Sequence, residues 1–186
     1  MAGDATKTSL WNGADVYINL EGSDGPTDTT TAWAAGWEVA GLLDGEEGFV
    51  EAREEETAEH YAWGGILYRR TKGKHKRTIK FVALEDNDVT FRLRNPGSTR
   101  TPGVGVITST VKVPTSYRFA IGFEVRDGDK VKRRVVKHAE VQEVDEVKES
   151  ESEPTVYTFT ILIFPEADGT LYTEVETLDE ATPDEG

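Results

Sequence analysis

The stretch that decides the fold is YRFAIGFEVR, residues 117–126, which reads as a β-strand. Its aromatic and aliphatic side chains occupy every second position from Tyr117 to Val125, and this alternation is typical of a strand with one buried face. Residues 155–164 alternate in the same way and end in the apolar run ILIF, which predicts burial on both faces there. We therefore expect residues 117–164 to form the centre of a β-sheet.

A turn sequence, Asp-Gly-Asp at residues 127–129, separates the first strand from a second one at residues 130–136. This order predicts a β-hairpin. A three-residue loop would set Ile121 opposite Val135, whereas a two-residue Asp-Gly loop would set it opposite Arg134. Because the hydrophobic pattern fixes strand register, we predict the three-residue loop.

Composition indicates one globular domain with segments outside its core. The chain has 186 residues, of which 37% are hydrophobic and 30% charged, and its formal net charge is −14. Such an acidic chain is poorly suited to tight nucleic-acid binding through counterion release. It has no cysteine, which excludes disulfides, zinc–thiolate sites and cysteine nucleophiles. Without a basic-then-apolar start or an 18-residue apolar run, we expect neither a signal peptide nor a membrane span.

Three regions are expected along the chain: a flexible N-terminal arm at residues 1–14, a single β-rich domain at 15–175 and an acidic tail at 176–186. Residues 97–114, rich in Gly, Thr, Ser, Pro and Val, are too long for an ordinary connector and predict an extended arm. Residues 139–152 carry valines three apart among acids, which fits a ragged helix and a bulged strand equally well.

The best helix candidate is residues 84–93. Asp86, Asn87 and Asp88 suit a first helical turn, and neither glycine nor proline interrupts the segment before the Asn-Pro-Gly at residues 95–97.

Two charged blocks stand close together. Residues 51–59 are rich in glutamate, and residues 69–80 are basic. We expect the basic block to top a hairpin that turns near Gly73. It could be a solvated tip or bind nucleic acid, but we prefer contact with the acidic block of a neighbouring copy, because opposite charges on different faces suit head-to-tail association. The expected subunit-interface residues are Arg69, Arg70, Lys72, Lys74, Lys76 and Arg77.

Candidate chemistry is sparse. The three histidines, His60, His75 and His138, are scattered without metal-ligand spacing, and we read the first and last as strand residues and His75 as a loop residue. Residues 85–88 offer the oxygens of a calcium loop, but the glycine and glutamate expected at its sixth and twelfth positions are missing. We find no phosphate-binding glycine loop or nucleophile motif. We therefore expect no enzyme, no metal site and no cofactor.

The order of features resembles the major tail proteins of long-tailed, siphovirus-type phages, the subunits of the tail tube. The resemblance covers roughly residues 15–175. It lies in WEVAGLLDG at 37–45, the following glutamate-rich run into AWGG at 62–65, KFVALEDN at 80–87, Arg133 with Val135 and Val136, YTFT at 157–160, and Pro165 with the Asp-Gly at 168–169.

This resemblance implies a mainly β, sandwich or barrel-like fold with one flanking helix, placed at residues 84–93, and extended loop arms, placed at 97–114 and at the basic hairpin. It also implies hexameric rings that stack into a tube, because exposed strand edges and arms can serve as assembly interfaces. A lumen lined by carboxylates would let DNA slide without binding it. We assign Glu51, Glu54 and Glu56 as the lumen-facing acids.

The implied partners are other copies of the chain, the tape-measure, tail terminator and baseplate proteins, and DNA in transient passage. The implied location is the virion tail, after assembly in the host cytoplasm, with no membrane contact. Two other classes fit a β-rich chain: another virion component, such as a head–tail connector or decoration protein, and a β-sandwich binding module. Copy number in the particle would separate a tube subunit from a connector.

Overall fold

Ten strands and one short helix follow one another within residues 7–178, the part of the chain that the structure, a computed structural model, describes. The strands are β1 (Gly13–Asn19), β2 (Glu38–Val39), β3 (Val50–Ala62), β4 (Ile66–Ala83), β5 (Thr99–Pro102), β6 (Ile107–Thr110), β7 (Phe119–Asp127), β8 (Lys130–Val144), β9 (Tyr157–Ile163) and β10 (Thr173–Glu176). The helix, α1, spans Asp88–Arg94. The chain is therefore mainly β, as the alternation predicts.

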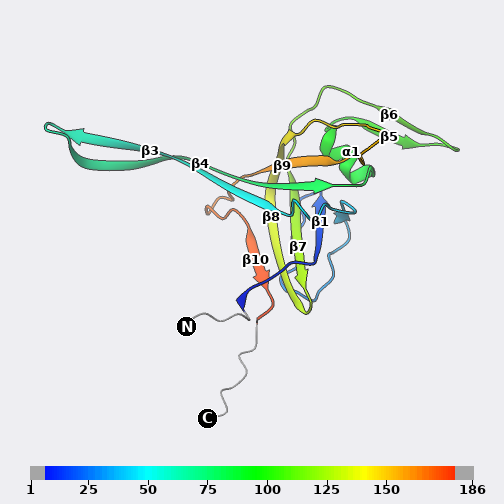
Figure 1. The fold of residues 1–186 in the computed structure, drawn as a ribbon, viewed down its shortest axis with the longest axis horizontal. Coiled ribbons are helices and arrows are strands. Elements are labelled where there is room, and N and C mark those ends of the chain that lie inside the picture. Colours follow the sequence, from blue (N-terminus) through cyan, green and yellow to red (C-terminus); the bar gives the residue numbers. More distant parts are fainter. Residues whose placement is uncertain (1–6, 179–186) are drawn as a thin grey trace, which may run out of the picture.

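One curved sheet forms the body, in the order β2-β1-β7-β8-β9-β4-β3, with β10 added beside β8 (Figure 1). Residues 38–44 pair with β1 on one side and with the end of β4 on the other. Tyr17 of β1 pairs with Val39, and Leu43 forms an isolated bridge to Ala83 at the end of β4. This segment closes the sheet on itself, which makes the body barrel-like and confirms the expected fold class.

The main core lies inside this curved sheet. Phe81, Phe123 and Phe159 are almost fully buried, and the Phe81 and Phe159 rings stack with their centroids 5.3 Å apart. Leu93 of α1 is fully buried in the same cluster. Burial of one such side chain contributes about 1.5–3 kcal/mol, so these few aromatic residues account for much of the stability of the body.

A second, smaller apolar layer covers the other face of the sheet. Trp33 stacks on Tyr17 with ring centroids 4.4 Å apart, and Trp37 is buried with Ala120 and Val135. The sheet is thus buried on both faces where β7 and β8 meet.

This double burial explains an error in the predicted register. Asp127 pairs with Lys130, so the loop has two residues, and Ile121 lies opposite Val136 rather than Val135. Val135 and Val136 point to opposite faces and both are buried. The hydrophobic pattern of β8 therefore did not identify one core face, and the predicted three-residue loop was wrong.

The later strands resolve two further expectations. Strand β8 continues to Val144 with a register shift between Val141 and Glu143, so the interpretation of residues 139–152 as a bulged strand is correct as far as Val144. In β9 the odd-numbered residues are buried and the even-numbered residues, including Leu162, are only partly buried. The predicted burial on both faces of the ILIF run was wrong.

The predicted helix exists but begins later than expected, at Asp88 instead of residue 84. It has seven residues, and no helix in the described chain is long and apolar enough to cross a bilayer.

Candidate assembly surfaces

The most prominent surface is a two-stranded arm that leaves the body (Figure 1). Strand β4 pairs with β9 only through residues 77–83, whereas residues 54–76 pair among themselves as the outer parts of β3 and β4. We call residues 54–76 the arm. At about 3.3 Å per residue, the arm reaches about 35 Å from its base to its tip. Its side chains are exposed on both faces apart from the partly buried Thr71 and Lys76.

The arm turns at Trp63, Gly64 and Gly65, not near Gly73, so the predicted turn was wrong. Both turn glycines have positive φ, 84° and 77°, a conformation that glycine adopts without steric cost. Gly73 instead lies within β4, next to a register shift. The Gly-Gly pair was the signal in the sequence that could have located the turn.

The acidic and basic blocks are adjacent strands of the same arm, and so their side chains pair within one chain. The pairs are Arg70–Glu59 (4.0 Å), Lys72–Glu55 (3.7 Å), Lys74–Glu56 (3.5 Å), Lys76–Glu54 (3.9 Å) and Arg77–Glu51 (2.9 Å). Most are exposed, and such pairs contribute about 0–1 kcal/mol each. The head-to-tail argument therefore cannot rest on opposite charges lying on separate faces.

The arm nevertheless differs in charge from the rest of the molecule. Residues 54–76 carry four carboxylates and five Lys or Arg side chains, so the arm has a small net positive charge in a chain of net charge −14. Within the described residues Arg69 has no ion-pair partner, and Arg70 lies at the 4.0 Å limit from Glu59. The arm is therefore close to neutral, with its basic side chains on β4, whereas the rest of the molecule is strongly acidic.

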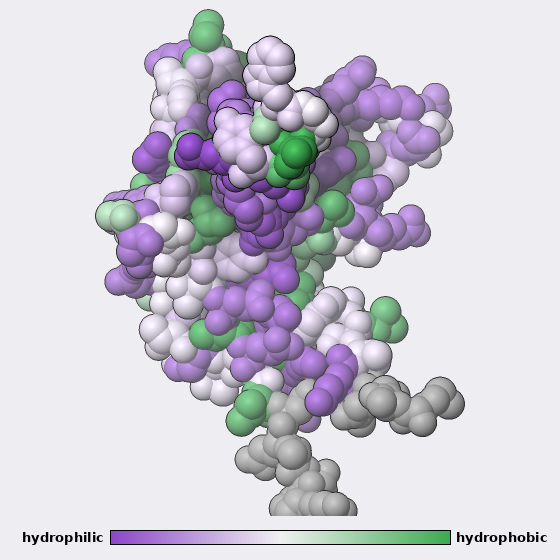
Figure 2. Space-filling model, turned by 90° about the vertical axis from the view of Figure 1, so that its left-hand side faces the viewer, coloured by the Kyte–Doolittle hydropathy of each residue, from purple (hydrophilic) through white to green (hydrophobic). Residues whose placement is uncertain are grey.

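The tip of the arm is apolar and aromatic. Tyr61, Trp63, Ile66, Leu67 and Tyr68 have exposed fractions of 56, 100, 67, 48 and 67%. In Figure 2, which looks at the arm end-on, green and pale atoms cap the tip above a mostly purple surface. Contiguous exposed apolar groups of this kind mark interaction sites. The sequence analysis did not identify this cluster.

The base of the arm holds one of the three acids expected in the lumen. Glu51 pairs with Arg77, lies 3.8 Å from Arg134 and accepts a hydrogen bond from the Tyr172 hydroxyl at 3.1 Å. Burial, and then the charge of Glu51, raise the pKa of Tyr172. Glu54, three residues along the strand, faces the opposite side. The structure does not bring Glu51, Glu54 and Glu56 together on one face.

A second projection, the β5–β6 hairpin, lies on the other side of the body within the long segment 97–114 (Figure 1). Val104 and Val106 in its turn and Ile107 at the start of β6 are exposed. Arg100 anchors it to the helix: its guanidinium lies 2.8 Å from Asp86 and 5.5 Å from the centre of the Phe91 ring.

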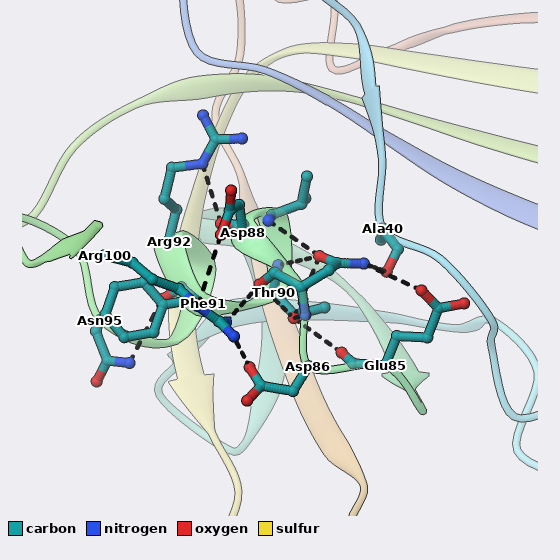
Figure 3. A network of polar contacts seen from close by, with 11 residues as sticks. Ala40, Glu85, Asp86, Asp88, Thr90, Phe91, Arg92, Asn95 and Arg100 are labelled. Atoms are coloured by element: carbon teal, nitrogen blue, oxygen red, sulfur yellow. Dashed lines mark hydrogen bonds and ion pairs between the residues drawn. The ribbon is translucent and has the colours of Figure 1, made fainter. Parts of the chain in front are cut away.

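The start of α1 is fastened to the segment that closes the sheet (Figure 3). The Asn87 side-chain oxygen accepts hydrogen bonds from the backbone N–H groups of Val89 and Thr90, both at 3.0 Å. The Asn87 amide nitrogen donates to the Ala40 carbonyl at 2.9 Å, and Glu85 accepts from the Leu42 backbone at 2.8 Å. The side-chain oxygens of residues 85–87 are thus used within the fold: Glu85 binds the Leu42 backbone, Asp86 pairs with Arg100, and Asn87 caps the helix.

The histidines are separated in the structure as in the sequence. His60 and His75 lie on the two strands of the arm, so the expectation of a loop residue at His75 was wrong, and His138 is an exposed residue of β8. His75 lies 3.5 Å from Glu55, whose pKa is lowered mainly by the hydrogen bond from Arg53. Among the described residues no three potential ligands form a metal-binding group.

Comparison with known proteins identifies a family and several solved structures that the chain resembles. A family model described as "Phage tail tube protein" matches residues 1–173. A chain of the sheath–tube complex of an extracellular contractile injection system, PVC, in its extended state has a TM-score of 0.52 at 8% identity, with 91% of this chain and 93% of that chain covered. At this identity the likeness shows the fold alone.

Two further solved structures align over most of the chain with lower scores. A chain of the anti-feeding prophage tube-terminating cap gives a TM-score of 0.49 at 10% identity, with 94% of this chain and 96% of that chain covered. A chain from the tail of an empty GTA particle gives 0.41 at 13% identity, with 87% and 93% covered. No curated protein matches the chain.

Proposed function

Because the chain belongs to the phage tail tube protein family, we propose that it is the repeating subunit of a tail tube. In this proposal copies associate into hexameric rings, the rings stack into a hollow tube, and DNA passes through the lumen. The family is one of structural proteins of the virion tail and not of enzymes.

The observation that carries the proposal is the long, aromatic-tipped arm, with a basic strand, on an acidic body. A two-stranded arm with both faces in water buries nothing in its own subunit, so its exposed apolar tip has a role only in contact with another molecule. Strand β3 also forms one end of the sheet, and within residues 7–178 no strand other than β4 pairs with it. Exposed edges of this kind are sites of strand addition between subunits.

The six basic residues first assigned to the subunit interface fall into two groups. Lys76 and Arg77 lie at the base, where Arg77 is largely buried against Glu51. Arg69, Arg70, Lys72 and Lys74 lie further out, and their exposed charges can reach an acidic body on a neighbouring copy. We propose the outer four as the contact residues and retain Lys76 and Arg77 as supports of the arm base.

The acidic balance of the chain supports passage of DNA without capture, since carboxylates repel phosphates. We propose Glu54 and Glu56 as lumen-facing acids, because their side chains are 69% and 70% exposed. Glu51 is a weaker candidate, because two arginines and a tyrosine already occupy its carboxylate.

Further proposed partners are a tape-measure protein inside the growing tube and terminator and baseplate proteins at its ends, with assembly in the host cytoplasm. These follow from family membership and from the need of a linear assembly for defined ends.

Electron microscopy of the purified protein tests the proposal. The protein would be imaged in negative stain over a series of concentrations and salt, with and without tail tips as nuclei. Rings or hollow tubes of uniform width are expected, and higher salt should raise the concentration needed because it screens contact between arm and body. A chain that stays monomeric at high concentration and low salt, even with nuclei, would refute the proposed function.

A further inference from the structure

A cavity of about 510 Å³ lies at the opposite end of β4 from the arm tip, between the N-terminal segment and the loop before β3. Its apolar walls include Trp11, Phe49 and Val125. Lys132 and Arg134 also line it, and both form ion pairs with Glu174 of β10. We call this cavity the seat. Its volume falls in the range of about 300–1,000 Å³ typical of sites that enclose a small molecule, so it has room for an aromatic side chain with its neighbours.

The rim of the seat is acidic. Asp44 and Glu47 are among the residues that line the seat, and Glu46 lies between them in the same turn; we call these three residues the rim. Among the described residues neither Glu46 nor Glu47 has an ion-pair partner, and Asp44 accepts a hydrogen bond from the Glu46 backbone at 2.8 Å. The seat thus combines an apolar interior with an anionic edge.

The arm tip has the complementary arrangement. Trp63 is fully exposed at the turn, with the apolar side chains of the tip beside it, and Arg69 and Arg70 follow at once on β4. Figure 1 shows the tip far from the start of β1, where the seat lies, and the paired strands of the arm cannot fold back over that distance. The tip and the seat of one chain therefore cannot meet each other.

We propose that the arm tip of one copy inserts into the seat of a second copy. The Trp63 indole enters between Trp11 and Phe49, and Arg69 and Arg70 meet Glu46 and Glu47 at the rim. The cations at the floor, Lys132 and Arg134, can lie against aromatic faces, as Lys132 does 5.8 Å from the Trp11 ring centre. The contact joins two different surfaces, so each copy keeps a free tip and a free seat for the next. This inference rests on the proposed self-association.

Substitution of the tip tryptophan tests the apolar part. Trp63→Ser should raise the protein concentration needed for assembly by at least about 30-fold, the effect of losing an aromatic hot spot. Trp63→Phe is the conservative control and should stay much closer to the unaltered chain. Because Trp63 is fully exposed, the unfolding midpoint of both variants in urea should be unchanged.

Exchange of charges tests the pairing of tip and rim. One variant reverses the tip (R69E, R70E) and a second reverses the rim (E46K, E47K), and each alone should assemble only at concentrations at least about 10-fold higher. A 1:1 mixture of the two should assemble as the unaltered chain does, because a reversed tip fits a reversed rim and an original tip fits an original rim. The matched control reverses two exposed acids elsewhere, E149K with E151K, and should have no such partner effect.

The outcomes separate this inference from the proposed function. If the unaltered chain forms no rings or tubes, the proposed function fails and this inference with it. If the unaltered chain assembles but the tip variants assemble equally well, the docking of the tip is refuted and the tube subunit stands. If only the rim variant loses assembly, a different segment fills the seat and the proposal is overturned. The same holds if neither variant assembles alone and their 1:1 mixture does not assemble either.

Discussion

At the scale of single residues, Gly122 is the glycine with the least room for a side chain, because the Trp33 ring lies against it. A Cβ atom at Gly122 would lie 2.1 Å from the Trp33 ring, so any other residue there must displace the indole from the sheet. We predict that Gly122→Ala lowers the free energy of unfolding by about 1–3 kcal/mol, the usual effect of overpacking. Gly45→Ala is the control, because nothing lies within 4 Å of its added Cβ. Equal urea midpoints for both variants would contradict this.

The buried carboxylate of Glu124 is a second position where a single side chain has a large effect on stability. It accepts hydrogen bonds from Trp33 Nε1 and Arg133 Nε, both at 2.8 Å, and from Arg126. Burial alone would raise its pKa, but these donors outweigh burial, and the folded-state pKa lies below the ordinary value of 4.5. A lowered folded-state pKa stabilises the protein above pH 4.5, and this contribution is lost as the pH falls through the folded-state pKa.

We therefore predict that Glu124→Gln lowers the free energy of unfolding by about 3 kcal/mol at pH 7, because it leaves the buried Arg133 without its counter-charge. The difference between the variant and the unaltered chain should shrink as the pH falls from 4.5 towards the folded-state pKa, because the unfolded chain is protonated first and the folded chain loses the charge only at the lower pH. Urea unfolding of both proteins at pH 7 and pH 3 measures this difference. A gap of the same size at both values would show that the ionised form of Glu124 is not what matters.

At the scale of elements, the seven-residue helix depends on its first cap. Asn87→Ala should lower the free energy of unfolding by about 1–2 kcal/mol, because it removes both the cap to Val89 and Thr90 and the bond to Ala40. Asn87→Ser keeps a capping oxygen but lacks the amide, so its loss should be smaller. Urea unfolding monitored by circular dichroism gives both values, and equal losses would mean that the cap contributes nothing.

The elements also show what the sequence could predict. Strict alternation predicted the strands β7 and β9 and their main core face correctly, because Phe119, Ile121 and Phe123 of β7 and the odd-numbered residues of β9 face one core. It did not predict that the even-numbered side of β7, residues 120–124, is buried as well. The register of β8 was not predictable from alternation, since Trp33 and Trp37, about a hundred residues earlier, bury its second face. The turn of the arm was predictable in principle from Gly64 and Gly65. It was placed near Gly73 instead, because the charged residues around Gly73 were interpreted as an exposed hairpin tip.

At the scale of the whole molecule, the arm and the body should be separable. We predict that replacing residues 55–75 with an Asn-Gly turn between Glu54 and Lys76, which are paired across the arm, leaves the body folded. The free energy of unfolding should change by about 1 kcal/mol or less, because the removed side chains are almost all exposed.

The same variant should form no rings or tubes under any condition in which the full chain does. Circular dichroism with urea unfolding reports on the body, and negative-stain microscopy reports on assembly. If the shortened chain assembles normally, the arm is not part of the subunit interface. If it fails to fold, the body depends on the arm for its stability.

The candidate site was only partly predictable at this scale. Charge counting identified a basic segment, and the structure places it on the arm as an exposed projection. Whether opposite charges meet within one chain or between chains depends on the position of one turn. That turn lies at residues 63–65 and not near Gly73, and the difference places the acidic and basic blocks side by side in one chain. The aromatic tip was not identified because its residues lie in strands that could equally have been part of a core.

The single-layer construction of the arm has one more consequence, in its dynamics. The arm has no second layer to shield its ladder of backbone hydrogen bonds, so those bonds open independently of the body. Amide hydrogen exchange in the free subunit should therefore be fast along residues 54–76 and slow in β7, β8 and β9, as for two separate cooperative units. A subunit that meets its neighbours with such an arm orders it on contact, and so association carries an entropic cost that makes early contacts reversible.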